Sequence, residues 1–276
     1  MKILKTIDEV RAARAGLGQL GLVPTMGFLH EGHLSLVRRA RAENSASAAT
    51  IFVNPTQFGP NEDLARYPRD LPRDLALLEG EGVDLVFVPE PAEIYPPGFA
   101  TAIEIGGVTE PLEGAVRPGH FAGVATVVAK LFNIVQPTRA YFGQKDAQQS
   151  VVIRKLVRDL NMPVEVVVAP TVREGDGLAL SSRNSYLTAE QRAVAPAIFR
   201  ALTAARARFE AGERDVGVLR SAARQVLEAE AAFAIDYVSV ADAETLRELD
   251  TVAGPALVSI AARLGATRLI DNLRLG

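Results

Sequence analysis

Two of the chain's three histidines lie in one short stretch, where His30 and His33 are separated by Glu31 and Gly32. A spacing of three residues places both imidazoles on one face of a helix. The preceding residues, Gly-Leu-Val-Pro-Thr-Met-Gly, read as a buried strand followed by a tight turn. Because the start of a helix presents free backbone N–H groups, this arrangement favours binding of a phosphate, with both histidines as donors.

The same pair has two other interpretations. Zinc sites use closely spaced histidines, but zinc needs three or four protein ligands. The chain has no cysteine, and its remaining histidine, His120, is distant in the sequence. We therefore expect no protein-built metal site. The second alternative, two ordinary helix histidines, stays open for this segment alone.

Two further polar residues lie next to apolar segments, one after a predicted strand and one before a predicted helix. Gln57 follows the apolar residues 48–53, and its amide offers both a donor and an acceptor to a ligand. A simple turn amide is the alternative. His120 precedes a long apolar segment, where it either faces a pocket or caps a helix.

Two more motifs carry charge. Lys145 and Asp146 lie where a predicted strand gives way to a helix. The lysine could neutralise a phosphate, and the aspartate could accept from a ribose hydroxyl or cap the helix. Ser181, Ser182 and Arg183 offer two hydroxyls and a guanidinium, which suit a triphosphate, although a solvated loop is the alternative.

The elements that would position these side chains alternate through the first 170 residues. A capping box, Thr6 with Glu9, opens a helix. Apolar runs predict strands at 20–24, 48–53, 84–88, 139–142 and 164–168, and alternation predicts an edge strand at 101–105; helices are expected at 32–43, 71–81, 119–135 and 147–160. Continuous apolar strands between helices indicate a parallel sheet covered on both faces, which binds ligands beyond the carboxyl ends of its strands.

The remaining residues predict a different architecture. Thr188 and Gln191 cap a long helix, a second helix follows at 216–230, and strand-like runs occupy 235–240, 256–262 and 267–273. Helices followed by adjacent strands indicate an α+β unit. We therefore expect a ligand-binding α/β domain at residues 1–173 and a smaller C-terminal α+β domain at 174–276 that covers the site.

Composition excludes several classes of protein. The net charge of the 276 residues is −3, from 30 basic and 33 acidic side chains, and no basic stripe is present, so we expect no nucleic-acid partner. No apolar run approaches the roughly 18 residues of a membrane span. The first residues run into a helix cap rather than a signal peptide, and the lack of cysteine fits the cytoplasm.

Five motifs occur in one order between Val23 and Asn184, and they are PTMGFLHEGH, FVNPTQF, RPGHF, FGQKDAQQ and SSRN. Together they resemble the pantothenate synthetase (pantoate–β-alanine ligase) family of the H-x-G-H nucleotidyl transferases. The resemblance implies a Rossmann-like parallel sheet. It implies that ATP, accompanied by Mg²⁺, and pantoate form pantoyl adenylate and pyrophosphate. The β-alanine amine then attacks the acyl carbon and releases AMP. It also implies a homodimer.

The resemblance also assigns roles to individual positions. His33 and His30 match proton donors, and with Lys145 and Arg183 they form the expected catalytic set. Gln57 and Gln149 match the amides that hold pantoate, with Gln57 also near β-alanine. The nucleotide contacts match Met26, Gly27, Phe28, Leu29, His30, Glu31, Gly32, His33, Gly143, Gln144, Lys145, Asp146, Val172, Leu180, Ser181, Ser182 and Arg183. Gln144, Leu180 and Thr56 depart from the commonest family residues and leave the main polar groups in place.

Attack of a carboxylate on the α-phosphorus brings two anions together, so catalysis consists mostly of positioning and charge stabilisation. We expect the four catalytic side chains to supply donors and positive charge. Water would destroy the acyl adenylate, so we expect residues 58–71 and 174–182 to cover the site. Two rival functions stay open: nucleotide transfer onto a phosphate that keeps the nucleotide, and nucleotide-dependent regulation without turnover.

Overall fold

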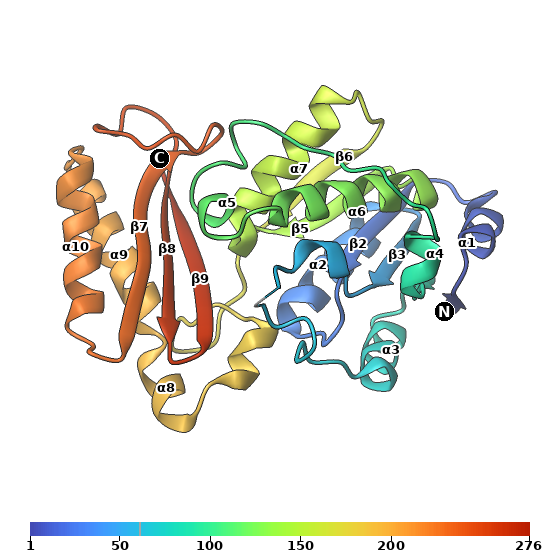
Figure 1. The fold of residues 1–276 in the computed structure, drawn as a ribbon, viewed down its shortest axis with the longest axis horizontal. Coiled ribbons are helices and arrows are strands. Elements are labelled where there is room, and N and C mark those ends of the chain that lie inside the picture. Colours follow the sequence, from blue (N-terminus) through green and yellow to red (C-terminus); the bar gives the residue numbers. More distant parts are fainter. Residues whose placement is uncertain (61) are drawn as a thin grey trace.

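The computed structural model of the chain describes residues 1–60 and 62–276 and contains two β-sheets that lie side by side (Figure 1). Asn61, which belongs to the predicted cover at 58–71, lies outside the described residues. The first sheet has six parallel strands, and the second has three antiparallel strands. The predicted fold class, a Rossmann-like α/β sheet followed by a smaller α+β unit, is confirmed.

The order of strands in the parallel sheet explains where a ligand can bind. The sheet runs β1 (Lys2–Leu4), β4 (Leu85–Phe87), β3 (Ala46–Ile51), β2 (Leu20–Thr25), β5 (Arg139–Gly143) and β6 (Glu165–Ala169). From β2 the chain moves to one side through β3 and β4, and later returns to the other side through β5 and β6. The gap between the carboxyl ends of β2 and β5 is therefore the topological switch point, where such sheets bind ligands.

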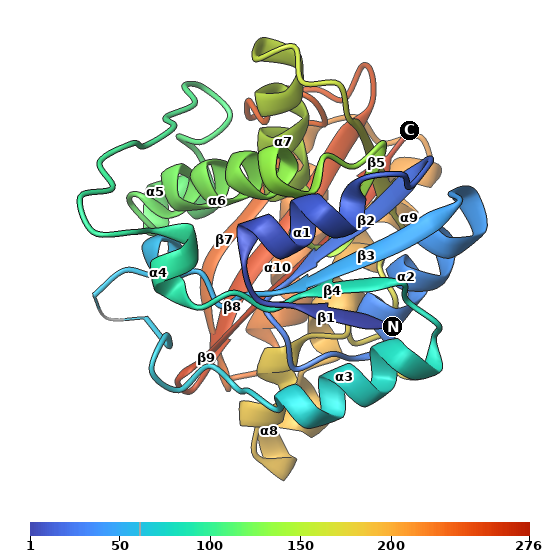
Figure 2. The same cartoon turned by 90° about the vertical axis from the view of Figure 1, so that its right-hand side faces the viewer.

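Helices cover both faces of this sheet (Figure 2). On one face lie α1 (Ile7–Arg14), α6 (His120–Val135) and α7 (Ala147–Asp159), and on the other lie α2 (Glu31–Glu43) and α3 (Leu71–Gly80). The helix α6 is almost entirely buried, as its apolar sequence requires. The capping box of Thr6 and Glu9 at α1 is present as predicted.

The predicted edge strand at 101–105 is wrong. Residues 101–105 have no strand partner; the backbone N–H of Ile103 instead donates to Oγ1 of Thr126 on α6 (2.9 Å), and Ile103 and Ile105 pack against the core. The alternation of apolar and polar residues at 101–105 therefore reflects the packing of Ile103 and Ile105 against the core beside α6 rather than strand pairing. The edge of the sheet is formed by β1, which the sequence did not predict and which pairs with β4. Two short helices, α4 (Pro91–Ile94) and α5 (Glu113–Val116), were also not predicted.

The second sheet consists of β7 (Phe233–Asp242), β8 (Ala256–Leu264) and β9 (Thr267–Leu275), as expected from the three strand-like runs. The capping box of Thr188 and Gln191 is present, but the single long helix after it is wrong. The chain forms α8 (Ala189–Val194) and α9 (Ala197–Glu210), because Pro196 has no N–H and its ring obstructs a continuous helix. With α10 (Val216–Glu228), α9 covers the sheet and closes a separate hydrophobic core. The domain boundary at 173/174 stays a prediction.

In the described ranges, 1–60 and 62–276, no helix combines the length and the apolar character that a membrane crossing requires.

Candidate active site

A cavity of about 230 Å³ opens at the carboxyl ends of β2, β3, β5 and β6, as the sheet topology predicts. Residues from all five sequence motifs line it. The predicted site residues among them are Met26, His30, Gly32 and His33 after β2; Gln57 after β3; Gly143, Lys145, Asp146 and Gln149 at the end of and after β5; Val172 after β6; and Leu180, Ser181, Ser182 and Arg183. The tertiary structure thus gathers residues that span more than half of the chain.

Five predicted nucleotide contacts do not line the cavity: Gly27, Phe28, Leu29, Glu31 and Gln144. Leu29 is buried in the core on the α2 side of the sheet, and the side chain of Glu31 pairs with Arg38 on the surface. Gly27, Phe28, Leu29 and Glu31 belong to the turn and helix start that carry the histidines, and Gln144 belongs to the 3₁₀ turn after β5, so in this structure their side chains do not face the cavity.

The turn that carries the histidines is held by a buried carboxylate, Asp74 of α3. Its two oxygens accept the backbone N–H groups of Phe28 (2.6 Å) and Leu29 (2.7 Å). Gly27 adopts φ +84°, and a Cβ there would lie 2.9 Å from an oxygen of Asp74, so only glycine fits. Sequence reasoning missed Asp74, because nothing near it in the chain indicates a partner 45 residues away.

The two imidazoles stack at the start of α2 with ring centroids 4.1 Å apart. Nδ1 of His30 accepts from the backbone N–H of Gly32 (3.2 Å), and Nδ1 of His33 accepts from the backbone N–H of His30 (3.3 Å). Each neutral ring therefore carries its proton on Nε2. A Cβ at Gly32 would lie 2.9 Å from the ring of His30, which explains the glycine between the histidines.

Both rings are neutral at physiological pH. Burial, together with the neighbouring His30 and Lys145, lowers the pKa of His33 to about 3. Burial and the charge of Lys145 likewise lower the pKa of His30 to about 4. In this structure the two histidines therefore enter the expected catalytic set as donors rather than as charges, and the joint role of His30, His33, Lys145 and Arg183 in catalysis stays a prediction. The two rings offer N–H donors, and the positive charge at this end of the cavity belongs to Lys145.

Lys145 lies on a 3₁₀ turn, η2 (Gln144–Asp146), that directly follows β5. Its Nζ is 3.6 Å from a carboxylate oxygen of Asp146, and both side chains line the cavity. The side chain of Gln144 turns away and donates to Oδ1 of Asn272 on β9 (3.0 Å). The second sheet thus contacts the lysine-bearing turn directly.

Gln57 ends a second 3₁₀ turn, η1 (Pro55–Gln57), where its amide donates to the sulfur of Met26 (3.2 Å). His120 supports this turn. Its Nδ1 is 2.8 Å from the carbonyl oxygen of Gln57, and its Nε2 is 3.0 Å from Nη1 of Arg117. A guanidinium can only donate, so Nε2 accepts and Nδ1 donates. Both nitrogens of His120 are thus engaged within the protein.

Arg183 lies on η3 (Ser182–Tyr186) and is paired in this structure. Its Nε and one Nη nitrogen each lie 2.9 Å from an oxygen of Asp63. Arg117 makes a similar two-point pair with Glu62, at 2.8 and 2.6 Å. Both carboxylates belong to the predicted cover at 58–71, and sequence reasoning missed both pairs because the partners are far apart in the chain.

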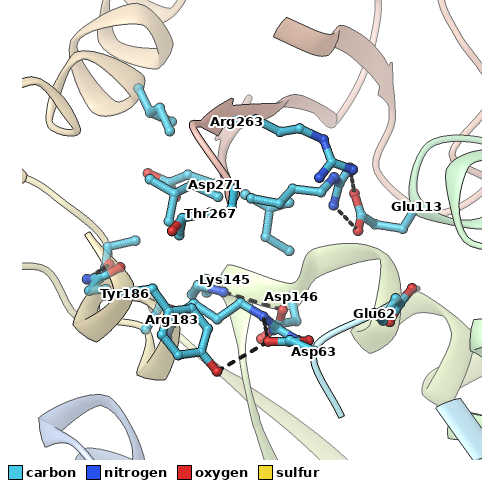
Figure 3. A pocket seen from close by; sticks show the side chains of 18 of the residues that line it. Glu62, Asp63, Glu113, Lys145, Asp146, Arg183, Tyr186, Arg263, Thr267 and Asp271 are labelled. Carbon is cyan, nitrogen blue, oxygen red and sulfur yellow. Dashed lines mark hydrogen bonds and ion pairs between the residues drawn. The ribbon is translucent and has the colours of Figure 1, made fainter. Parts of the chain in front are cut away.

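The pair of Arg183 and Asp63 borders a second cavity of about 320 Å³ that extends between the two sheets. Figure 3 shows Arg183 and Tyr186 directed at Asp63, with Lys145 and Asp146 beside them. This cavity continues from the first, since Lys145, Asp146 and Arg183 line both. Within residues 1–60 and 62–276, no group of three or more histidine, aspartate or glutamate side chains is arranged to hold a metal ion.

The comparisons with known proteins agree with this site. The family model for pantoate-beta-alanine ligase matches residues 2–274. The chain is 66% identical over 273 residues to a pantothenate synthetase of Roseiflexus sp. (strain RS-1), covering 99% of this chain and 98% of the relative. It is 64% identical over 274 residues to that of Herpetosiphon aurantiacus, covering 99% of each.

Two solved structures are similar over almost the whole chain. A crystal structure of pantothenate synthetase from Thermus thermophilus has a TM-score of 0.95 and 54% sequence identity, and the match covers 99% of each chain. A pantoate-beta-alanine ligase from Francisella tularensis, complexed with β,γ ATP and β-alanine, has a TM-score of 0.81 and 35% identity, over 99% of this chain and 97% of that one. The chain therefore belongs to the pantoate–β-alanine ligase family, whose activity is the joining of pantoate to β-alanine.

Proposed function

We propose that the ligation proceeds in two steps at the cavity between β2 and β5. In the first, a carboxylate oxygen of pantoate attacks the α-phosphorus of ATP, which forms pantoyl adenylate and releases pyrophosphate. In the second, the β-alanine amine attacks the acyl carbon, loses a proton, and expels AMP to give pantothenate. The use of ATP is supported by the ATP and β-alanine in the complex of the Francisella tularensis relative.

The observation that carries the proposal is the pair of neutral imidazoles at the carboxyl edge of the sheet. His30 and His33 each carry a proton on Nε2, so both can donate to phosphate oxygens without drawing the incoming carboxylate into an ion pair. Lys145, which lines the same cavity, supplies the positive charge for the crowded phosphorus. Donors that are already oriented stabilise developing charge without reorganisation during the reaction.

The remaining roles divide between the acid and the nucleotide. We propose that the amides of Gln57 and Gln149, which line the cavity, hold pantoate, with Gln57 also contacting β-alanine. The nucleotide would contact backbone and side-chain groups of residues 26–33, 143–146, 172 and 180–183. Arg183 can bind the phosphates of the nucleotide only if its ion pair with Asp63 breaks, because carboxylate and phosphate compete for the same face of the guanidinium.

Magnesium fits this site as part of the substrate. The described residues offer no three-ligand cluster, and Mg²⁺ is commonly bound through one or two carboxylates together with substrate phosphates and water. Asp146, which lines the cavity beside Lys145, is the carboxylate we propose for that contact. When bound, the ion would neutralise charge on the departing pyrophosphate.

We further propose that the enzyme is a homodimer, as the family resemblance implies, and that it is cytoplasmic, which the lack of cysteine fits. We also propose that residues 1–173 and 174–276 form separate domains, as the change in the pattern of helices and strands suggests. Sedimentation at micromolar concentration, cell fractionation and limited proteolysis test these three points. Cleavage should concentrate near residue 173 if the boundary is right.

The mechanism is tested with the His33→Ala variant. Loss of one oriented donor should lower pantoate-dependent ATP–pyrophosphate exchange by about 10²–10³-fold. Arg39→Ala, on the exposed face of the same helix, is the matched control and should keep the exchange rate. A folded His33→Ala protein with near-normal exchange would remove this histidine from the chemistry.

A further inference from the structure

The second sheet contacts the proposed active site through two consecutive residues of β9, Asp271 and Asn272. Both side chains are polar and buried, each about 4% exposed. Buried polar groups cost stability unless they are hydrogen-bonded, so what these two contact indicates their role.

The side-chain amide of Asn272 makes hydrogen bonds to the turn η2. Its Nδ2 donates to the carbonyl oxygens of Gln144 and Lys145, both at 2.9 Å, and its Oδ1 accepts from the side-chain amide of Gln144 at 3.0 Å. One asparagine therefore engages two consecutive carbonyls of the turn η2. A buried carbonyl left without a donor costs roughly 1–3 kcal/mol, so the turn is held in the orientation that keeps both bonds.

Asp271 binds a second segment of the proposed nucleotide site. Its carboxylate forms a two-point pair with Arg173, at 2.5 and 2.9 Å, and also accepts the backbone N–H of Asn272 at 2.8 Å. Arg173 directly follows Val172, whose carbonyl accepts from the backbone N–H of Leu180 at 3.0 Å. The two residues of β9 thus hold both the lysine-bearing turn and the segment after β6. Figure 3 shows Asp271 and Lys145 around the same cavity.

We propose that Asn272 is a positioning residue for the formation of the acyl adenylate and that it acts through Lys145. Its side chain holds the peptide groups of residues 144 and 145, and these set the direction in which the lysine side chain leaves the backbone. This inference rests on the proposed role of Lys145. A displacement of about 1 Å at a reacting group can cost roughly 100-fold in rate. Loss of Asn272 therefore lowers kcat for adenylate formation more than it changes substrate binding.

The test uses two substitutions of Asn272 and one control. Asn272→Asp keeps the volume but turns a carboxylate oxygen toward two carbonyl oxygens, and Asn272→Ala removes all three hydrogen bonds. In pantoate-dependent ATP–pyrophosphate exchange, both should lower kcat by roughly 10- to 100-fold, with KM for pantoate within about threefold of the native value. Arg274→Ala, at an exposed position of the same strand, should keep both constants.

The decisive measurement repeats Asn272→Ala on a Lys145→Ala background. If Asn272 acts through the lysine, its removal there should change exchange less than about threefold. An undiminished tenfold loss on that background would show that Asn272 acts independently, and native kcat in both single variants would equally overturn the proposal. A general structural defect would instead raise every KM or lower the fraction of folded protein measured by circular dichroism. If the unmodified protein shows no pantoate-dependent exchange, the proposed function fails rather than this inference.

Discussion

The three histidines should make the folded protein unusually sensitive to mild acid. Burial lowers the pKa of His30 to about 4, of His33 to about 3 and of His120 to about 4, against 6.5 for an ordinary histidine. In the unfolded chain these groups bind protons below about pH 6.5, whereas in the folded chain they stay neutral. The unfolded state therefore binds more protons as pH falls, and the stability present above about pH 6.5 is lost progressively down to about pH 4.

The size of the effect follows from the same pKa values. Between about pH 7.5 and pH 5, each histidine that titrates only in the unfolded state should lower the free energy of unfolding by about 2 kcal/mol. The three together should lower it by about 6 kcal/mol, which is comparable with the whole stability of many domains. At about pH 5, the lower of the two pH values, most carboxylates of the unfolded chain are still ionised. The histidines therefore account for most of the difference in the free energy of unfolding between the two pH values.

Urea unfolding followed by circular dichroism at about pH 7.5 and pH 5 measures this loss. The His120→Gln variant provides the internal check, since it removes one of the three groups and should shrink the loss by about a third. A loss below about 1 kcal/mol in the native protein, or the same loss in the variant, would refute the conclusion that these imidazoles stay neutral in the fold.

Two further predictions concern the substrates. Gln57→Ala should raise KM for pantoate roughly tenfold or more, because a hydrogen-bond partner in the cavity is lost. KM for ATP should change less than about threefold. If steady-state kinetics show that binding of both substrates is weakened equally, Gln57 does not line a pocket for the acid. Asp63→Asn should lower KM for ATP several-fold, because the substitution frees the guanidinium of Arg183 to bind phosphate. The control, Glu62→Gln, changes the ion pair with Arg117 instead and should leave KM for ATP within about twofold of the native value. A higher KM for ATP in Asp63→Asn would show that the pair of Asp63 and Arg183 helps to bind the nucleotide.

The sequence predicted most elements of the parallel sheet because local patterns are enough for them. Short apolar runs between amphipathic segments indicated five of its six strands, and the capping residues at Thr6 and Thr188 marked the starts of helices. The sixth strand, β1, is only three residues long and pairs with β4, which lies near the middle of the predicted domain 1–173 and far from β1 in the sequence. A segment this short has too few residues to show the alternation of a strand. The alternation of apolar and polar residues at 101–105 led instead to the wrong prediction of an edge strand there.

The proposed site divides in the same way. His30, His33 and the glycine between them could be identified locally, because their spacing and the turn before them are properties of one short segment. The protonation of the rings could not, because it depends on burial by residues distant in the chain. The sequence suggested donors and positive charge from four side chains together, and burial makes the two histidines the neutral donors among them.

The residues that hold the site in place were decided by the tertiary structure alone. Asp74 fixes the histidine turn, Asp63 occupies Arg183, and Asn272 fixes the turn of Lys145, across separations of 45, 120 and 127 residues. A carboxylate or an amide has the same local appearance whether it faces solvent or a backbone N–H in another element. The chemistry of the site was therefore readable from residue types and order, whereas its geometry and charge state required the packing of the two sheets.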